Sequence, residues 1–262
     1  MKIPIYQVDA FTSERFGGNP AAICLLDDWL DDSVMLNIAK ENNLAETAFL
    51  VPFSENQFYL RWFTPEIEMD LCGHATLASA FVIFHYLKPN YDIVHFRTKS
   101  GKLTVNRSGE YLIMDLPSRP AEPAELPKII SSALNIQPIK TFKARDYLLL
   151  YDDEQSIRNL KVDETILKSI NLNPGGIIVT AQGQNADFVS RFFTPGAAVF
   201  EDPVTGSAHC SLAPFWAERL GKGKLKALQL SKRGGKLQCE LMGDRVAVSG
   251  QVVPYLIGHI EV

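Results

Sequence analysis

Hydrophobic and polar residues alternate along much of the chain, and this pattern predicts a protein built mainly of strands. In the first half, strands are expected at residues 3–11, 21–26, 44–51, 58–63, 93–96, 101–105 and 111–116. One helix is expected to begin at Asp31 or Asp32, because aspartate is a favoured N-cap residue. Ser108 and Gly109 are typical of a hairpin turn.

Two longer segments depart from this alternation, because they are apolar on nearly every side. They span residues 73–87 and 207–220, and Gly221 follows the second one. A helix on the protein surface would carry a charged face. We therefore expect each segment to form a central, buried helix with a curved sheet around it.

A proline-rich stretch at residues 117–123 is the clearest linker, since proline stiffens the chain and lacks a backbone donor. It separates an expected N-terminal module, residues 1–117, from a C-terminal module, residues 118–262. The second module is expected to contain helices at 126–134 and around 163–170, and strands at 146–151, 176–181, 187–193, 237–241, 245–249 and 252–257. The last of these strands is a candidate to return to the first module.

The two halves share a motif. Arg61-Trp62-Phe63-Thr64-Pro65 is matched by Arg191-Phe192-Phe193-Thr194-Pro195 about half of the 262-residue chain later. Each copy is followed by a glycine, Gly73 or Gly206, at the start of an apolar helix. We interpret the halves as two copies of one module that face each other, with a site where the two glycine-started helices meet.

Composition narrows the class of protein. With 46% hydrophobic residues, the chain can bury the core of one large domain or of two ordinary ones, and the repeat favours two. A net charge of −4 without a basic run indicates neither a nucleic-acid partner nor a membrane-surface partner. The start of the chain lacks a signal-peptide core, and the four cysteines are scattered, so a reducing cytoplasm is expected.

The two glycine turns are candidate anion sites. The first N–H groups of a helix are unpaired and carry a partial positive charge, and glycine lets the backbone approach a ligand closely. Gly73 and Gly206 could thus hold a small anionic metabolite through a carboxylate, without lysine or arginine. Each turn taken alone is also compatible with an ordinary helix start, but the matched pair favours a shared binding site.

Glu46 is the candidate proton-transfer group. It lies in the otherwise apolar run Asn43-Leu44-Ala45-Glu46-Thr47-Ala48-Phe49. A carboxyl group in such surroundings is partly desolvated, which suits it to taking up and returning a proton near neutral pH. The alternative is a glutamate that faces outward at the edge of a sheet.

Three further polar residues lie beside the turns. His74 directly follows Gly73, where the helix N-terminus disfavours imidazolium, so it is expected to be neutral and to form hydrogen bonds unless it is merely structural. Asp202 is a second carboxylate for the site or the former of a turn. Ser207 takes the position of His74 in the second copy and is a hydroxyl donor or a helix cap.

Metal and cofactor chemistry are disfavoured. Cys72, His74, His209 and Cys210 would supply four ligands if the turns converged, but the spacings usual for zinc are absent. Ser207 lacks the nucleophile elbow of a hydrolase. Neither a GxGxxG motif nor a P-loop occurs, so no nucleotide cofactor is expected.

Four motifs together resemble one family. Phe16-Gly17-Gly18-Asn19-Pro20, Asn43-Leu44-Ala45-Glu46-Thr47, Cys72-Gly73-His74-Ala75-Thr76 and Glu201-Asp202-Pro203-Val204-Thr205-Gly206-Ser207 occur in this order. In this they are similar to the PhzF-like isomerases, named for phenazine biosynthesis, and the likeness runs over essentially the whole chain. The run from Ala208 to Pro214 is most similar to the uncharacterised bacterial branch.

This resemblance implies an α+β, pseudo-symmetric two-domain fold shared with diaminopimelate epimerase, in which each curved, mostly antiparallel sheet wraps a central helix. It also implies a cofactor-free isomerase, commonly a homodimer, with its active site between the modules. The residues that the resemblance assigns are the proton-transferring Glu46, the supporting His74, Asp202 and Ser207, and the anion-binding Gly73 and Gly206.

The related epimerase uses two thiols, and here the two corresponding positions differ. Cys72 stands at the first, whereas Thr205 occupies the second, and a threonine hydroxyl is too weak an acid to replace a thiol. We therefore expect a cytoplasmic, cofactor-independent isomerase that moves a proton by means of Glu46. An epimerase or racemase that pairs Cys72 with Glu46, and a non-catalytic binder of an anionic metabolite, remain as alternatives.

Overall fold

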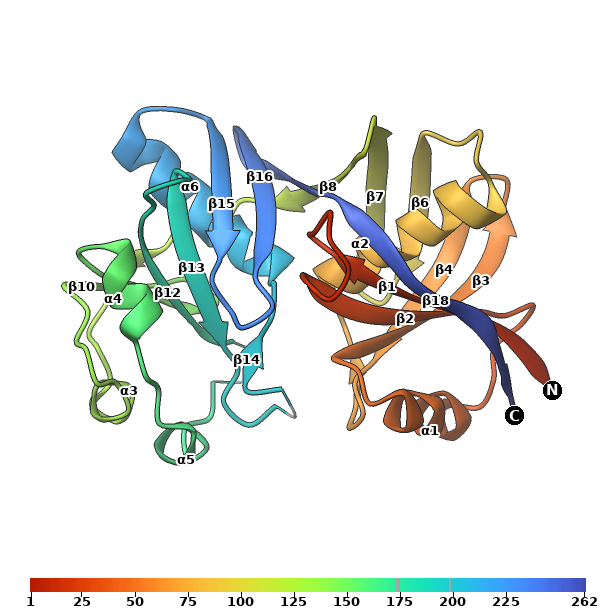
Figure 1. Cartoon of the computed structure of the whole chain (residues 1–262), viewed down its shortest axis with the longest axis horizontal. Coiled ribbons are helices and arrows are strands. Elements are labelled where there is room, and N and C mark those ends of the chain that lie inside the picture. Colours follow the sequence, from red (N-terminus) through yellow and green to blue (C-terminus); the bar gives the residue numbers. More distant parts are fainter. Residues whose placement is uncertain (173–174, 198) are drawn as a thin grey trace. The chain divides into compact units, whose positions relative to one another are not determined.

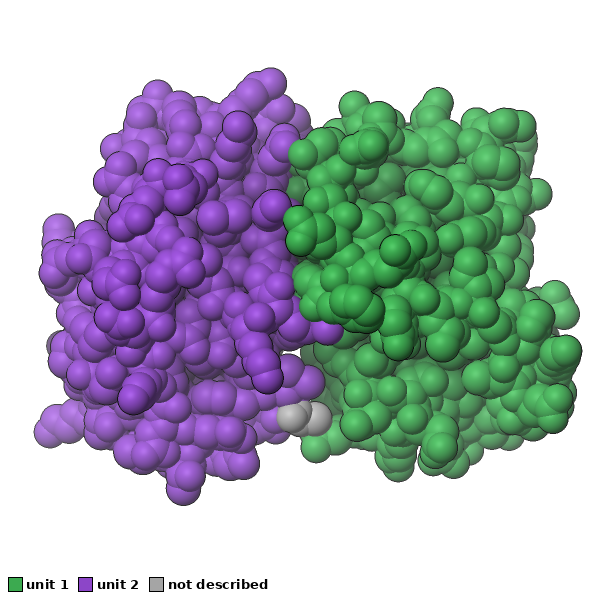
Figure 2. All heavy atoms as spheres, in the orientation of Figure 1, with its two compact units in different colours: residues 1–115, 249–262 green, residues 116–248 purple. Residues whose placement is uncertain are grey.

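The computed structural model describes residues 1–172, 175–197 and 199–262. The chain divides into two compact units, which Figure 2 shows in two colours. Unit 1 comprises residues 1–115 and 249–262, and unit 2 comprises residues 116–248. The last strand thus belongs to the same unit as the first, and at the chain ends Met1 and Val262 form backbone hydrogen bonds.

Unit 1 is a mostly antiparallel sheet. Its strands are β1 (Lys2–Ala10), β2 (Asn19–Leu25), β3 (Glu46–Ser54), β4 (Gln57–Phe63), β5 (Glu68–Met69), β6 (Ile93–Thr98), β7 (Gly101–Ser108), β8 (Tyr111–Pro117) and β18 (Val252–Glu261) (Figure 1). Their order is β18-β1-β2-β3-β4-β6-β7-β8, and only the β2–β3 and β4–β6 pairs are parallel. The two-residue β5 pairs with the end of β4.

Two helices pack on this sheet. α2 (Gly73–Val82) contacts β1, β2 and β3, and every one of its residues from His74 to Val82 is buried, as its apolar sequence predicted. Its last turn continues as a π-helical segment, η1 (Ile83–Leu87). α1 (Asp32–Asn42) packs in a hydrophobic cluster that includes Ile3, Ile5, Cys24 and Phe49. Because α2 also packs on these strands, both of their faces are buried.

Unit 2 repeats the strand pairings of unit 1. Its strands are β9 (Glu122–Pro123), β10 (Lys140–Lys143), β11 (Tyr147–Leu150), β12 (Ile177–Gln182), β13 (Phe188–Phe193), β14 (Glu201–Asp202), β15 (Lys224–Gln229) and β16 (Gly235–Met242), and β17 (Arg245–Gly250) leads back to unit 1. The β11–β12 and β13–β15 pairs are parallel, like β2–β3 and β4–β6. The pairs β10–β11, β12–β13, β13–β14 and β15–β16 are antiparallel.

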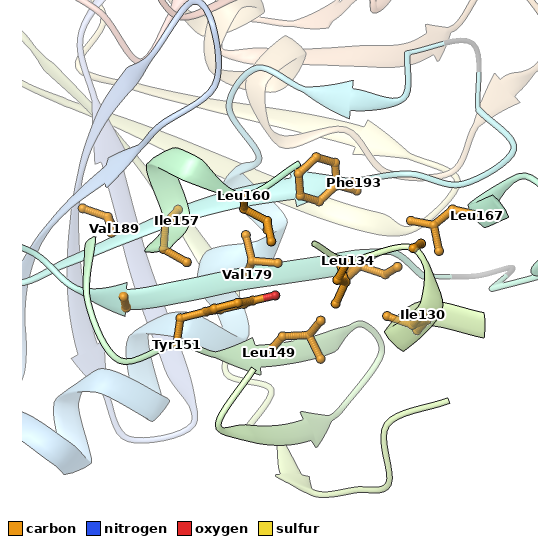
Figure 3. Packing of buried hydrophobic residues seen from close by; sticks show 13 residues of the cluster. Ile130, Leu134, Leu149, Tyr151, Ile157, Leu160, Leu167, Val179, Val189 and Phe193 are labelled. Carbon is orange, nitrogen blue, oxygen red and sulfur yellow. The ribbon is translucent and has the colours of Figure 1, made fainter. Parts of the chain in front are cut away.

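The helices of unit 2 are α3 (Lys128–Ser132), α4 (Glu154–Asn159), α5 (Glu164–Leu167) and α6 (His209–Leu220), with a 3₁₀ turn η2 (Gly206–Ala208) before α6. Figure 3 shows how Ile130, Ile157 and Leu167 of the three short helices gather with Leu149 of β11 and Val179 of β12. α6 packs on β15 and β16 and ends at Gly221, whose positive φ of 65° favours glycine. Like α2 in unit 1, it follows the glycine turn of its unit.

The sequence prediction differs from the structure in several elements. β10, α4 and β15 were not predicted, and the helix expected at 126–134 is the single turn α3. The second central helix opens with the 3₁₀ turn η2 instead of running uniformly from Ser207. Asp31 is the N-cap of α1, as expected. Among the described residues, no helix combines the length and apolar composition that are needed to cross a membrane.

The repeated arginine motif forms the same ion pair in each unit. Arg61 donates from Nε and Nη2 to the two carboxylate oxygens of Glu68, at 2.7 and 2.8 Å. Arg191 does the same to Glu201, at 2.7 and 2.9 Å. Such two-point arginine–carboxylate contacts fix geometry as well as charge. Each pair joins the strand of the motif to the short strand that precedes the glycine turn.

Candidate active site

Glu46 is the first residue of β3, a strand in the interior of the sheet. β2 lies on one side of it, with Ala21 opposite Glu46, and β4 lies on the other. The preceding Asn43 ends α1 in the left-handed conformation, with φ of 49°, and this turns the chain into the strand. The side chain is 15% exposed. Glu46 therefore does not face outward from a sheet edge, which was the alternative left open by the sequence.

His74 meets Glu46 from the start of α2. Its Nε2 lies 3.0 Å from Glu46 Oε2, and its side chain is 5% exposed. The two residues are far apart in the sequence and adjacent in space because α2 packs across β2 and β3. A largely buried carboxylate beside an imidazole is an arrangement suited to holding and moving a proton.

The other nitrogen of His74 faces two different groups. Nδ1 lies 3.1 Å from Nδ2 of Asn19 and 3.5 Å from Sγ of Cys72. Asn19 is completely buried at the first position of β2. Gly18 before it has φ of +62°, and a Cβ there would lie 2.2 Å from the Ala10 carbonyl oxygen, so only glycine fits. The glycine turn of the first motif thus places an amide against His74.

Burial controls the charge of these groups. It raises the pKa of the Cys72 thiol to about 11, with a further contribution from Glu46, so the thiol is protonated at neutral pH. Burial lowers the pKa of His74, whereas Cys72 and Glu46 raise it, and the raising effects are larger. The effect of Cys72 belongs to its thiolate form. With a protonated thiol, Glu46 is the charge that acts on the imidazole.

The same three residues are close enough together to be considered as metal ligands. A ligand atom of Glu46, of Cys72 and of His74 can be chosen so that all lie within 4.8 Å of one another. However, Glu46 contacts Nε2 of His74 while Cys72 contacts Nδ1, on the opposite side of the ring. One ion cannot be bound by both nitrogens of one imidazole, so the opposite positions of Glu46 and Cys72 around the ring disfavour a shared ion.

In unit 2, the predicted residues Asp202 and Thr205 are bonded to each other. Thr205 Oγ1 donates to Asp202 Oδ2 at 2.5 Å, as in a turn-forming role. Gln229, at the end of β15, accepts from the Thr205 amide at 2.9 Å and donates to the Asp202 carbonyl at 2.8 Å. Gln229 is 1% exposed and was not identified from the sequence. Its alternating strand, Lys224–Gln229, was the only signal available.

The residue before each glycine is held in the same way. Thr76 Oγ1 donates to the Cys72 carbonyl at 2.5 Å, and His209 Nδ1 donates to the Thr205 carbonyl at 2.9 Å. Both donors lie four residues after the carbonyl that they hold. Burial lowers the pKa of His209 to about 4, so its ring is neutral and carries its proton on Nδ1. Its role is to stabilise the start of the helix by donating to the Thr205 carbonyl. Below, Thr76 and His209 are called the braces of the two carbonyls.

The structure therefore brings the predicted residues together in two sets. Glu46, Cys72, Gly73 and His74 lie in unit 1, while Asp202, Thr205, Gly206 and Ser207 lie in unit 2. Ser207 is half-buried in the turn η2, between the buried Gly206 and Ala208. That the two glycine turns face each other stays a prediction.

Comparison with known proteins agrees with these features. The family model described as phenazine biosynthesis-like protein, PhzC-PhzF, matches residues 8–258. The chain belongs to this family. It is 49% identical over 261 residues to an uncharacterised isomerase of Pseudomonas aeruginosa, covering 100% of both chains. The expectation of an isomerase is confirmed at this level, because the curated bacterial relatives carry that name.

Solved structures confirm the fold. The crystal structure of a PhzF family protein from Enterococcus faecalis is 44% identical, with a TM-score of 0.95 over 100% of both chains. A hydroxyproline epimerase from Agrobacterium vitis is only 10% identical, yet has a TM-score of 0.62 over 99% of this chain and 92% of its own. That likeness shows the fold alone. The predicted two-domain, epimerase-like architecture is correct.

Proposed function

We propose that the chain is a cofactor-independent isomerase that shifts a proton within a small carboxylate-bearing metabolite, with Glu46 as the acid and base. The observation that carries this proposal is the contact of the largely buried Glu46 with the buried His74, 3.0 Å apart, in the interior of the sheet. Membership of a family whose relatives are named isomerases supports the reaction class.

In the proposed reaction, the Glu46 carboxylate takes a proton from a carbon atom of the substrate. The electron pair of the broken C–H bond moves into the conjugated part of the substrate, and the negative charge rests on its oxygen atoms. Glu46 then returns the proton to a different carbon, so no oxidant, reductant or cofactor is consumed. His74 holds the carboxylate in place through Nε2.

Anion binding is assigned to the helix starts. The amides that follow Gly73 and Gly206 would stabilise the developing negative charge, because the first N–H groups of a helix are free to donate. Asp202 and Ser207 would orient the substrate, as the family resemblance implies. The bonds that hold the Thr205 carbonyl and amide leave this turn in one conformation, which favours such a preorganised role.

A second candidate is an epimerase in which Cys72 supplies one of the two protons. Its thiol lies 3.5 Å from His74 Nδ1, and a protonated thiol can donate to a carbanion. Cys72→Ser separates the two reactions. The Glu46 mechanism should keep most of its turnover in this variant, whereas the thiol-dependent epimerase should lose it.

Deuterium wash-in followed by proton NMR tests the proposal. Wild type, Glu46→Gln and the surface control Glu41→Gln are incubated in D₂O with a panel of small amino and hydroxy acids. We expect exchange at carbon with wild type and Glu41→Gln, and a loss of about 10²–10⁴-fold with Glu46→Gln. Equal exchange in all three proteins would contradict the role of Glu46. Ligand binding without exchange would indicate the non-catalytic binder.

Cofactor independence and assembly are tested separately. Turnover should survive exhaustive dialysis against a chelator, and added nicotinamide or pyridoxal cofactors should not increase it. We also propose a homodimer, as expected from the family resemblance. Light scattering should then give about twice the chain mass of 29.2 kDa.

A further inference from the structure

His74 has a different partner on each ring nitrogen, and the chemistry of these partners restricts its proton. Glu46 on Nε2 is a carboxylate and accepts hydrogen bonds. Asn19 presents its amide nitrogen to Nδ1, and an amide nitrogen can only donate. We propose that Asn19 is a positioning residue that keeps His74 neutral, with the single proton on Nε2, the nitrogen beside Glu46.

Both groups around Nδ1 are donors. Besides the Asn19 amide, the Cys72 thiol lies 3.5 Å away and is protonated, because burial raises its pKa to about 11. Among the described residues, a proton on Nδ1 would then face the Asn19 amide, which can only donate, and the Cys72 sulfur, which accepts only weakly, and this is costly inside a protein. A lone pair on Nδ1 accepts from them instead. The neutral ring with its proton on Nε2 suits the donors at Nδ1 and places the N–H group beside Glu46, whose Oε2 lies 3.0 Å from Nε2.

The backbone around Asn19 is closely constrained, which favours a fixed position of its amide beside the ring. It is completely buried, and it begins β2 opposite Ala10 of β1. Gly18 precedes it in a conformation that only glycine adopts easily, and Pro20 follows with a fixed φ. The Phe16-Gly17-Gly18-Asn19-Pro20 motif thus has a definite task, which is to present one amide to the histidine of the site.

The consequence for catalysis, which rests on the proposed function, concerns the strength of the base. An imidazolium beside Glu46 would neutralise the carboxylate and weaken it as a base. A neutral imidazole keeps an N–H group 3.0 Å from Glu46 Oε2 and leaves the negative charge on the carboxylate. Glu46 by itself favours the charged imidazolium. The Asn19 amide favours the neutral ring instead, and in this way it preserves the negative charge of Glu46.

Asn19→Asp tests this assignment, because it changes the donor into an acceptor with almost no change of shape. Full-length protein labelled with ¹⁵N-histidine is examined by long-range proton–nitrogen correlation, and the His74 signals are identified by their absence in His74→Gln. In wild type near neutral pH, we expect Nδ1 to be unprotonated and Nε2 to be protonated. In Asn19→Asp we expect both nitrogens to be protonated, with the midpoint of His74 raised by about one to three pH units.

Asn42→Asp is the matched control. Its amide donates to Thr47 Oγ1 at 3.0 Å and does not contact His74, so the same chemical change there should leave the His74 signals unaltered. A wild-type His74 with protons on both nitrogens near neutral pH would overturn the proposal. So would an unchanged midpoint in Asn19→Asp. If Asn19→Asp does not fold, Asn19→Ala, which removes the donor, should still raise the midpoint.

The NMR measurement of the His74 protonation state does not depend on turnover. If His74 is neutral as described and no panel compound exchanges deuterium, the Asn19 assignment stands and the proposed function fails. If exchange depends on Glu46 while His74 is doubly protonated in wild type, the proposed function stands and the assignment to Asn19 fails.

Discussion

The helix starts of the two units have the same scaffold and different chemistry. In both, a two-point arginine–glutamate pair precedes the glycine turn, and a side chain four residues on holds the carbonyl before the glycine. Unit 1 adds groups that can carry protons, Cys72 and His74, where unit 2 has Thr205 and Ser207. The scaffold is duplicated, but the positions on either side of the glycine carry titratable side chains in unit 1 only, Cys72 and His74 against Thr205 and Ser207.

The position of the base shows the difference most clearly. Thr47 pairs with Phe63 in unit 1 as Ile177 pairs with Phe193 in unit 2, so the counterpart of Glu46 is Gly176. A Cβ at Gly176 would lie 2.4 Å from Cζ of Phe192, which leaves no room for a side chain. The comparison teaches that a side chain at the position of Glu46 fits in unit 1 and not in unit 2, so the proposed proton transfer is assigned to unit 1 and unit 2 offers a helix start for the proposed binding.

The largest effect is expected at the two side chains that donate to the carbonyl before each glycine, Thr76 in unit 1 and His209 in unit 2. Only His209 can titrate. Burial lowers the pKa of His209 to about 4, while an unfolded histidine titrates near 6.5. The folded state favours the neutral ring, so this difference in pKa contributes to the free energy of unfolding above about pH 6.5. The contribution, about 3 kcal/mol in total, is lost as the pH falls towards 4. His209→Phe should remove that part of the acid sensitivity. Urea unfolding at several pH values measures it, and an identical pH dependence in the variant would contradict this account.

Gly176→Ala tests whether unit 2 has room at the position of the base. The added Cβ meets the Phe192 ring and the Phe193 carbonyl oxygen, so we expect a loss of about 1–3 kcal/mol in the free energy of unfolding. Gly223→Ala is the control, because the nearest atom to its Cβ lies 3.8 Å away. If both variants are equally stable by urea unfolding, a side chain fits at position 176, and the proposed difference between the two units at this position is wrong.

Thr76→Val removes the brace of unit 1 without changing the size of the side chain. The Cys72 carbonyl then keeps only the Thr76 amide, at 3.2 Å, and we expect a loss of about 1 kcal/mol. Deuterium exchange should fall as well, since Gly73 and His74 follow this carbonyl directly. Thr104→Val on β7 is the control, because it also removes a side-chain hydrogen bond, the one to His95 Nδ1 at 3.0 Å, but should leave exchange unchanged. Full exchange in Thr76→Val would show that the brace does not position the site.

The smallest effect is expected at the feature that the two units share. Arg61→Lys and Arg191→Lys each replace a two-point contact with a one-point contact, and each should cost about 0.5–1 kcal/mol. Both side chains are largely buried. Arg61 also contacts the exposed Asp32, whereas Arg191 also donates to the carbonyls of Ile157 and Leu160, so the loss should be the larger for Arg191. Thermal unfolding of the two variants measures this. A larger loss for Arg61 would contradict this account.

Much of the fold was predictable because its signals are local. The alternation of apolar and polar residues identified most strands, and the absence of charge in residues 73–87 predicted the buried helix α2. β10, α4 and α3 are too short to show a full period, so they were missed or overextended. β15 was visible in principle, since Lys224–Gln229 alternates between exposed and buried positions over most of its length.

The candidate site was predictable as motifs but not as contacts. Glu46, Cys72 and His74 could be named, yet nothing local indicates that His74 meets Glu46 with one nitrogen and Asn19 with the other. Gln229 and Thr205 are 24 residues apart in the sequence, and their bond depends on the packing of β15. Hydrogen bonds between residues far apart in the sequence are decided by tertiary packing, which no short motif encodes.

The most direct test of the account compares exchange and binding in Glu46→Gln and Ser207→Ala, once a substrate has been found by deuterium wash-in. The account predicts that Glu46→Gln loses exchange at carbon and keeps its affinity, whereas Ser207→Ala loses affinity and still exchanges at saturating substrate. Undiminished exchange in Glu46→Gln would contradict the assignment of proton transfer to unit 1.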